Sequence, residues 1–155
     1  MKISTKKLII SLAVPLAVGG LGSLLSGGMD TYQTLSQPPL SPPGWVFPIV
    51  WSILYLMMGY ASYRIWMSGA AREERRKALL FYGTQLALNF LWPIIFFGFQ
   101  AYWLAFVVLL ILWLFIYLTM HLFGEIDETA ENFLIPYLFW VTFAGYLNLG
   151  VALLN

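Results

Sequence analysis

The sequence predicts an all-α integral membrane protein, a bundle of five transmembrane helices that forms a single domain over residues 1–155. The first observation is composition: 61% of the residues are hydrophobic and 10% are charged, and the mean hydropathy is +0.79. A soluble domain is usually about half apolar and a quarter charged. The second observation is that five stretches are long and apolar enough to cross a hydrocarbon core, which takes about 20 helical residues. These stretches lack the apolar–polar alternation of barrel strands.

The first span is expected over residues 8–25, directly after Lys2, Lys6 and Lys7. A secretory signal peptide has the same order of basic and apolar residues. Here the apolar run is longer than in a usual signal peptide, and no Ala-x-Ala cleavage site follows. We therefore expect a helix that is retained in the protein.

The second span is expected over residues 46–66, after a loop at 27–44 that is rich in Pro, Ser and Gly. Two proline pairs, Pro38-Pro39 and Pro42-Pro43, fix φ and favour extended backbone. This composition predicts an ordered lid and not a flexible linker. The third span is expected over residues 78–99, and the charged run at 72–77 before it is interpreted as a solvated turn.

The fourth and fifth spans are expected over residues 102–122 and 133–154. His121 stands alone at the end of the fourth span, which favours an interfacial residue over a metal ligand. Acidic residues precede the fifth span, where negative charge complements the helix dipole. They are Glu125, Asp127, Glu128 and Glu131.

The distribution of charge predicts the orientation. With five spans, every basic residue falls on the N-terminal side of the membrane. The positive-inside rule then predicts a multi-pass protein of the cell membrane with a cytoplasmic N-terminus, an external C-terminus and an external lid. The basic residues are Lys2, Lys6, Lys7, Arg64, Arg72, Arg75, Arg76 and Lys77.

The same composition disfavours several classes of function. A net charge of +1 argues against a nucleic-acid partner, which needs a basic face. The absence of cysteine excludes disulfides and thiolate metal sites, and no metal ligand set is expected. No Asp or Glu lies within a predicted span, and the odd number of spans offers no inverted repeat, so ion-coupled transport is disfavoured.

Three predicted helix faces carry aromatic and neutral polar residues at helical spacing. Each face by itself fits interhelical packing, but together they predict an apolar pocket with a few orienting polar groups, suited to a flat hydrophobic ligand. Pro93 frees the carbonyl of Asn89 and predicts a kink there. The faces are Trp51, Tyr55 and Met58; Gln85, Asn89, Trp92 and Phe96; and Trp140, Ala144 and Asn148.

Three sequence blocks carry a resemblance to a known family. They are Tyr32-x-x-Leu35 with Pro38, Pro42-Pro43, Trp45, Phe47, Trp51 and Leu54-Tyr55; Gln85-Leu86-Ala87-Leu88-Asn89 with Trp92 and Phe96-Phe97-Gly98; and Pro136-Tyr137-Leu138-x-Trp140 with Phe143-Ala144 and Leu147-Asn148. In this order and spacing they resemble the translocator protein (TspO/MBR) family, also called tryptophan-rich sensory protein or peripheral-type benzodiazepine receptor, in its bacterial form.

The resemblance implies a five-helix bundle, usually dimeric, with a ligand cavity under the first loop. It implies protoporphyrin IX and drug-like hydrophobic molecules as ligands, with no cofactor required. A small-xxx-small pattern, Gly83 and Ala87 on the third helix, fits a homodimer contact. The pocket residues carried over are Tyr32, Pro42, Pro43, Trp51, Asn89, Trp140 and Ala144, to which the predicted faces add Trp92 and Asn148.

Two departures from the family pattern modify these expectations. Thr31 and Leu40 stand where the family usually has tryptophan, which makes the lid less aromatic. The segment after Leu147-Asn148 lacks the Tyr and Arg of the animal sterol pattern, so no high-affinity cholesterol site of that kind is expected.

Three functions remain open at this point. The leading one is a membrane receptor or sensor that binds tetrapyrroles in the helix bundle. The second is a light-dependent porphyrin-degrading enzyme, in which Trp51 and Trp140 would be the catalytic residues. The third is a passive carrier of a lipophilic metabolite, which neutral helix faces permit.

Overall fold

The computed structural model describes residues 3–27 and 30–155 of the chain. Lys2 and residues 28–29 of the predicted lid lie outside the described residues. In the described part, five helices are long and apolar enough to cross a membrane, and no strand is present. The predicted all-α membrane fold is therefore confirmed. The helices are α1 (Thr5–Leu25), α2 (Val46–Trp66), α3 (Arg72–Pro93), α4 (Tyr102–Ile126) and α5 (Glu128–Leu154), with two short helices, η1 (Asp30–Thr34) and η2 (Ile94–Gly98).

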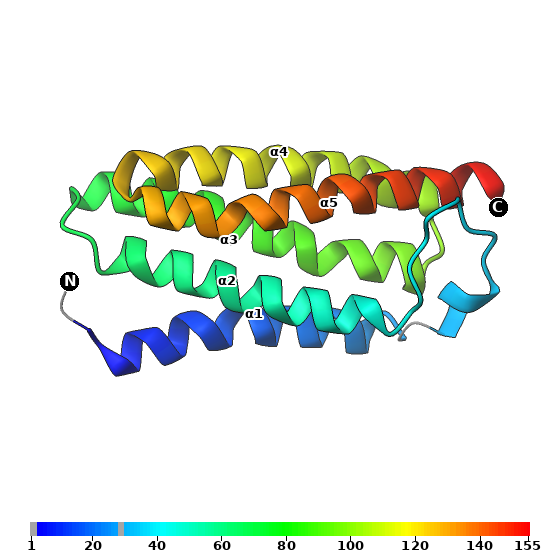
Figure 1. The fold of residues 1–155 in the computed structure, drawn as a ribbon, viewed down its shortest axis with the longest axis horizontal. Helices are drawn as coiled ribbons and strands as arrows, with labels where there is room; N and C mark the ends of the chain where they lie inside the picture. The colour runs from blue at the N-terminus through cyan, green and yellow to red at the C-terminus, as the bar shows by residue number, and fades with distance from the viewer. Residues whose placement is uncertain (1–2, 28–29) are drawn as a thin grey trace.

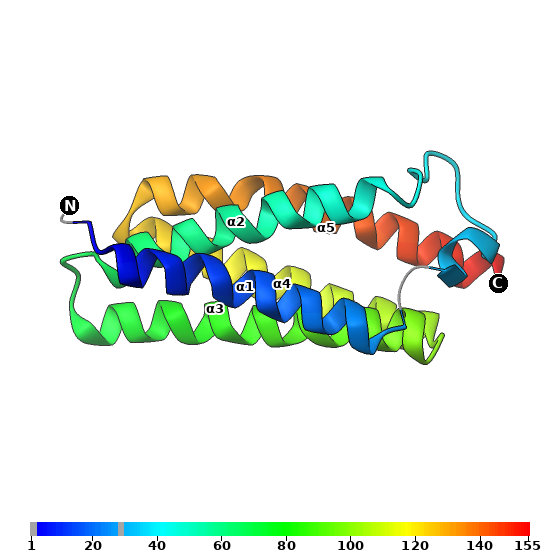
Figure 2. The ribbon, with the colours of Figure 1, turned by 90° about the horizontal axis from the view of Figure 1, so that it is seen from below.

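The five long helices lie side by side along the long axis of the molecule (Figures 1 and 2). The N-terminus and the α2–α3 and α4–α5 turns lie at one end, which we call the charged end. The lid, the α3–α4 connection and the C-terminus lie at the other, which we call the lid end (Figure 1). α4 packs on α3 and α5, whereas α1 packs on α2 and α3, and α2 also packs on α5.

Three helices begin earlier than hydropathy predicts, and the first of them is α1, which begins at Thr5 and not at residue 8. α3 begins at Arg72 and not at residue 78, so the run at 72–77 is its first turns and not a separate turn. Glu73 and Glu74 lie in that first turn, where they complement the helix dipole. α5 begins at Glu128 and not at residue 133. Hydropathy locates only the part of a helix that is in lipid, whereas acidic residues in the first turn of α3 and a capping side chain at α5 favour an earlier start.

Asp127 explains the start of α5. Its carboxylate accepts a hydrogen bond of 3.0 Å from the backbone N–H of Thr129, which satisfies one of the free donors of the first turn. The same carboxylate forms an ion pair of 2.8 Å with Arg64 of α2. One side chain therefore caps α5 and ties it to α2.

Further contacts join α1 and α3 to the end of α2 at the charged end. The backbone N–H of Ser4 donates to the hydroxyl of Tyr63 over 3.0 Å. The ammonium of Lys7 lies 5.1 Å from the ring centre of Trp66, and Arg75 donates to the Trp66 carbonyl over 3.2 Å. Four of the long helices are thus connected at this end.

The surface of the bundle is as apolar as its interior. Large side chains fill the interior, among them Met58, Ile65, Phe123, Leu134 and Tyr137. Comparable apolar side chains, such as those of Ile9, Leu110 and Leu114, point outward and are largely exposed. Outward apolar faces are unfavourable in water but are solvated by lipid. The exposure pattern therefore agrees with a membrane protein.

Candidate ligand cavity

A cavity of about 300 Å³ lies toward the lid end of the bundle. Side chains from α1, α2, α3, η2 and α5 line it, and Tyr32 of η1 also contributes to the wall. None of the described lining residues is Asp, Glu, Lys, Arg or His. The wall is therefore apolar and aromatic, with a few neutral polar groups, as is usual for small-molecule sites.

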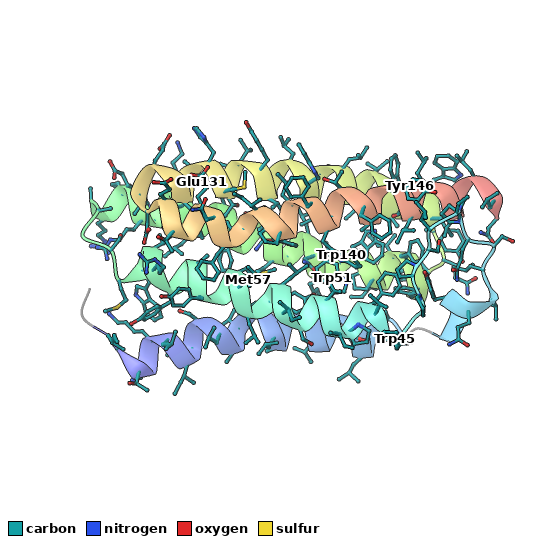
Figure 3. All side chains as sticks on the ribbon, in the orientation of Figure 1. Trp45, Trp51, Met57, Glu131, Trp140 and Tyr146 are labelled. Atoms are coloured by element: carbon teal, nitrogen blue, oxygen red, sulfur yellow. The ribbon has the colours of Figure 1, made fainter. Side chains whose placement is uncertain are left out.

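Most of the predicted pocket residues come together in this wall. Trp51 and Trp140, which lie in the middle of the bundle, are labelled in Figure 3. Pro42 and Pro43 are not among the described lining residues, but the Pro42 carbonyl accepts a hydrogen bond of 2.9 Å from the Tyr32 hydroxyl. Whether any of these residues contacts a ligand stays a prediction. The predicted residues that line the cavity are Tyr32, Trp51, Asn89, Trp92, Trp140, Ala144 and Asn148.

Aromatic rings form a connected wall from the lid to α5. The ring of Tyr32 meets Phe47 edge-on at 5.0 Å, and Phe47 meets Trp140 in the same manner at 5.9 Å. On α2, Trp51 stacks on Tyr55 with ring centres 5.5 Å apart. Such pairs add about 0.5–1.5 kcal/mol beyond their buried area. The wall is therefore held in place by its own ring contacts.

A chain of hydrogen bonds leads from the cavity into the core. The Tyr55 hydroxyl donates to Asn89 Oδ1 over 3.1 Å, and Asn89 Nδ2 donates to the Tyr137 hydroxyl over 2.6 Å. Tyr137 in turn donates to Gln85 Oε1 over 2.7 Å. The chain joins α2, α3 and α5. Asn89 contributes both its amide oxygen, as an acceptor, and its amide nitrogen, as a donor. Polar side chains that bond across helices hold membrane bundles in one arrangement.

A second polar contact joins α3 and α4 to α5 beside the cavity. The indole N–H of Trp92 donates to Asn148 Oδ1 over 2.9 Å, and Asn148 Nδ2 donates to the Tyr102 carbonyl over 3.0 Å. Trp92 also stacks on Phe96 at 4.9 Å. Asn148 is therefore engaged with protein groups on both sides of its amide.

Trp140 differs from Trp92 in its hydrogen bonding. Its indole nitrogen is buried and has no hydrogen-bond partner among the residues that the structure describes. A buried donor that stays unpaired costs about 1–3 kcal/mol. Trp140 lines the cavity through other atoms of its side chain, and the nitrogen itself is inaccessible to solvent.

The predicted break at Pro93 takes the form of a π-helical turn. α3 ends at Pro93, and η2 continues the chain with wider turns, closed by a 3.0 Å bond from the Phe99 N–H to the Ile94 carbonyl. Pro93, Phe96 and Phe97 all line the cavity. π-Turns are frequent at functional sites because they redirect side chains.

α1 contributes a wall that the predicted pocket lacks. Its lining residues are spaced at three or four positions and lie on one helix face, a signal that was present in the sequence but was hidden by the uniform apolarity of the span. Gly19 is the critical one, because any side chain there would overlap the ring of Tyr55. The α1 side of the lining consists of Leu16, Gly19, Gly20, Ser23 and Ser26.

Tyr32 lies outside the spanning helices, in the lid. It is 6% exposed, and this burial raises the pKa of its phenol above the ordinary value, while a hydrogen bond with Ser41 opposes the rise. The phenol therefore stays protonated at physiological pH. It can act as a donor to the Pro42 carbonyl throughout that range.

The predicted dimer face is open in the structure. Gly83 and Ala87 are both exposed on α3, and a side chain built at Gly83 would meet no atom within 4 Å.

A metal-ligand set is not found in the part of the chain that the structure describes: it contains no group of three or more His, Cys, Asp or Glu side chains that could hold an ion.

The fold and the cavity together define a class: a five-helix membrane protein with a neutral, tryptophan-lined cavity near a proline-rich loop. A family model described as the TspO/MBR family matches residues 11–154. The chain belongs to the TspO/MBR family, which confirms the resemblance seen in its sequence blocks.

Individual relatives come from distant organisms. The chain is 39% identical over 150 residues to "Tryptophan-rich protein TspO" of Chlorobaculum tepidum, covering 96% of this chain and 95% of that one. It is 39% identical over 139 residues to "Protein CrtK" of Rhodobacter capsulatus, with coverage of 88% and 85%. It is 38% identical over 138 residues to "Translocator protein" of Ovis aries, with coverage of 87% and 82%.

Proposed function

We propose that this protein is a membrane receptor or sensor that binds a tetrapyrrole such as protoporphyrin IX in the cavity beneath the lid. Membership of a family whose members are called tryptophan-rich sensory protein and translocator protein supports a sensor or receptor role in a membrane. The observation that carries the choice of ligand is the cavity wall, which brings Trp51 of α2 and Trp140 of α5 together.

The chemistry of the wall favours a flat, conjugated and mostly apolar molecule. Indole and phenol rings offer broad surfaces on which such a molecule can stack. The carboxylates of a porphyrin would stay at the mouth, because the described lining holds no cation and burying an unpaired charge is strongly unfavourable.

A titration followed by the Soret absorbance of protoporphyrin IX tests this proposal in purified protein. We expect saturable binding, weakened about tenfold in Trp51→Phe and in Trp140→Phe, because buried tryptophans carry much of the energy of a binding site. Trp103→Phe is the matched control, since Trp103 is exposed on α4. Binding that does not saturate, or a double variant that binds like the original protein, contradicts the proposal.

A second candidate is light-dependent degradation of the bound porphyrin. It is favoured by the same pair of indoles, Trp51 and Trp140, which both line the cavity and would contact an excited ligand. The test compares loss of the Soret band in light and in darkness, in the original protein and in Trp51→Phe. Equal loss in detergent without protein excludes this candidate.

Two further proposals concern assembly and transport. Gly83 and Ala87 form the contact of a homodimer. Cross-linking in membranes tests this contact, and Gly83→Leu is expected to abolish the cross-linked dimer.

Passive carriage of the ligand across the bilayer stays a prediction of the sequence. Uptake by proteoliposomes, compared with empty vesicles, measures it directly.

A further inference from the structure

The lid is attached to α5 at three points. In Figures 1 and 2 the loop passes beside the C-terminal turns of α5, far from the charged end. The first point is Asn155, whose amide pairs with both backbone groups of Ser36. The Ser36 N–H donates to Asn155 Oδ1 over 3.2 Å, and Asn155 Nδ2 donates to the Ser36 carbonyl over 2.8 Å. One side chain thus satisfies the backbone of a lid residue as a neighbouring strand would.

The second and third points are Gly150 and Tyr146. Pro38 lies against Gly150 so closely that any side chain at position 150 would overlap its ring, and Pro38 is buried there. The Tyr146 hydroxyl, labelled in Figure 3, donates to the Pro39 carbonyl over 2.7 Å. We call Tyr146, Gly150 and Asn155 the latch.

The latched segment is connected to the cavity through Tyr32. Gln37, which lies between two latched residues, donates from Nε2 to the Tyr32 carbonyl over 2.6 Å. The Tyr32 hydroxyl donates to Pro42 on the far side of the lid. The ring of Tyr32 lines the cavity, so the position of this wall residue depends on the position of the latched segment.

Leu40 indicates that the closed lid is under strain. It follows the latched Pro39 and has φ of 70°, in the left-handed region that is unfavourable for a leucine. Its side chain is 84% exposed, so its own packing does not compensate for this conformation. The strain persists because neighbouring contacts hold the backbone. Release of the latch would relieve it, which favours opening.

We propose that the latch sets how long the lid stays closed over the cavity and therefore how slowly a bound ligand leaves. Tyr146, Gly150 and Asn155 act as positioning residues: they do not line the cavity themselves, and through the lid they hold Tyr32 in its wall. The statement about the ligand rests on the proposed function. The closure of the lid does not, and it can be measured without a ligand.

Hydrogen exchange of the ligand-free protein, followed by mass spectrometry on peptides that contain Ser36, measures the closure. We expect exchange to be roughly fivefold faster in Tyr146→Phe, because one hydrogen bond is lost and local opening becomes more populated. Because Tyr146 does not bond to Ser36 itself, this variant reports opening of the whole segment. Asn155→Ala and Gly150→Ala are expected to change exchange in the same direction.

Two control variants isolate the latch. Tyr117→Phe also removes a hydroxyl, but at the lipid-facing surface of α4. Gly69→Ala adds a methyl group, as Gly150→Ala does, but at an open position between α2 and α3. Both are expected to exchange like the original protein. If Gly150→Ala does not fold, Tyr146→Phe decides the question, because it deletes a single oxygen.

The second measurement is the dissociation rate of protoporphyrin IX. It should rise by the same factor as the exchange rate in each latch variant. Unchanged exchange in Tyr146→Phe and Asn155→Ala overturns the latch, and faster exchange with an unchanged dissociation rate overturns its control of the ligand. If protoporphyrin IX does not bind the original protein, the proposed function and the control of that ligand fail together, whereas the exchange data still decide the latch.

Discussion

Asn89 is the residue at which the cavity and the core meet. It lines the cavity, accepts a hydrogen bond from Tyr55 and donates one to Tyr137. A ligand that displaces Tyr55 would therefore change the environment of a buried network. This arrangement gives a sensor a physical route from ligand binding to helix packing.

Tyr137→Phe tests the strength of this network. The variant leaves Asn89 Nδ2 and Gln85 Oε1 without the hydroxyl that joins them. Hydrogen bonds between membrane helices average about 0.6 kcal/mol, and unpaired buried groups add to the loss. We expect the free energy of unfolding to fall by about 1–2 kcal/mol.

Unfolding in mixed micelles, followed by circular dichroism, measures this change. Tyr117→Phe serves as the control, because its ring stacks on Trp113 at an exposed surface. An equal loss in the two variants would show that the network does not stabilise the bundle.

At the scale of single residues, the sequence predicted which residues line the cavity better than it predicted their hydrogen-bond partners. Trp51, Asn89 and Trp140 were assigned from spacing and motif, and all three line the cavity. The sequence did not indicate that Tyr55 bonds to Asn89 or that the Trp140 N–H is left free. Partner choice depends on distances between different helices, which no helical period records.

The helices differ in how much of their role could be read locally. α2, α3 and α5 carry amides and aromatic residues that mark an inward face. α1 is apolar on every side, because lipid and cavity both accept apolar residues, and its part in the cavity became visible only in the structure. Its Gly19 provides the space for the ring of Tyr55.

Gly19→Ala tests the role of α1 in the site. The added methyl group displaces the Tyr55 ring and weakens its bond to Asn89, so porphyrin affinity should fall about fivefold, the effect of losing one hydrogen bond. A Soret titration gives the affinity. Gly69→Ala, at an open position between α2 and α3, should bind as the original protein does. Equal affinities in all three proteins would show that neither Gly19 nor Tyr55 contributes to porphyrin binding.

The two ends of the whole molecule have different roles. At the charged end, α2 is joined to α5 by Arg64 and Asp127, and to α1 by Ser4 and Tyr63. At the lid end, the loop rests on α5 and covers a cavity. If the lid opens as proposed, these contacts keep the helices joined at the charged end.

The orientation of this molecule can be measured because the chain has no cysteine. The basic residues that the structure describes lie at the charged end, so that end should be cytoplasmic. We expect an impermeant maleimide to label Gln33→Cys in intact cells and Gly69→Cys only after the cells are permeabilised. Both positions are exposed. The reverse pattern would contradict the predicted orientation.

The class of fold followed from composition and span length, because lipid requires apolar residues in helices of a minimum length. The family followed from blocks of residues whose order needs no structure to recognise. The contribution of α1 to the cavity and the contacts of the lid with α5 were decided by the tertiary structure. Each depends on contacts between segments far apart in the chain, such as Tyr146 with Pro39, and local patterning carries no record of such distances.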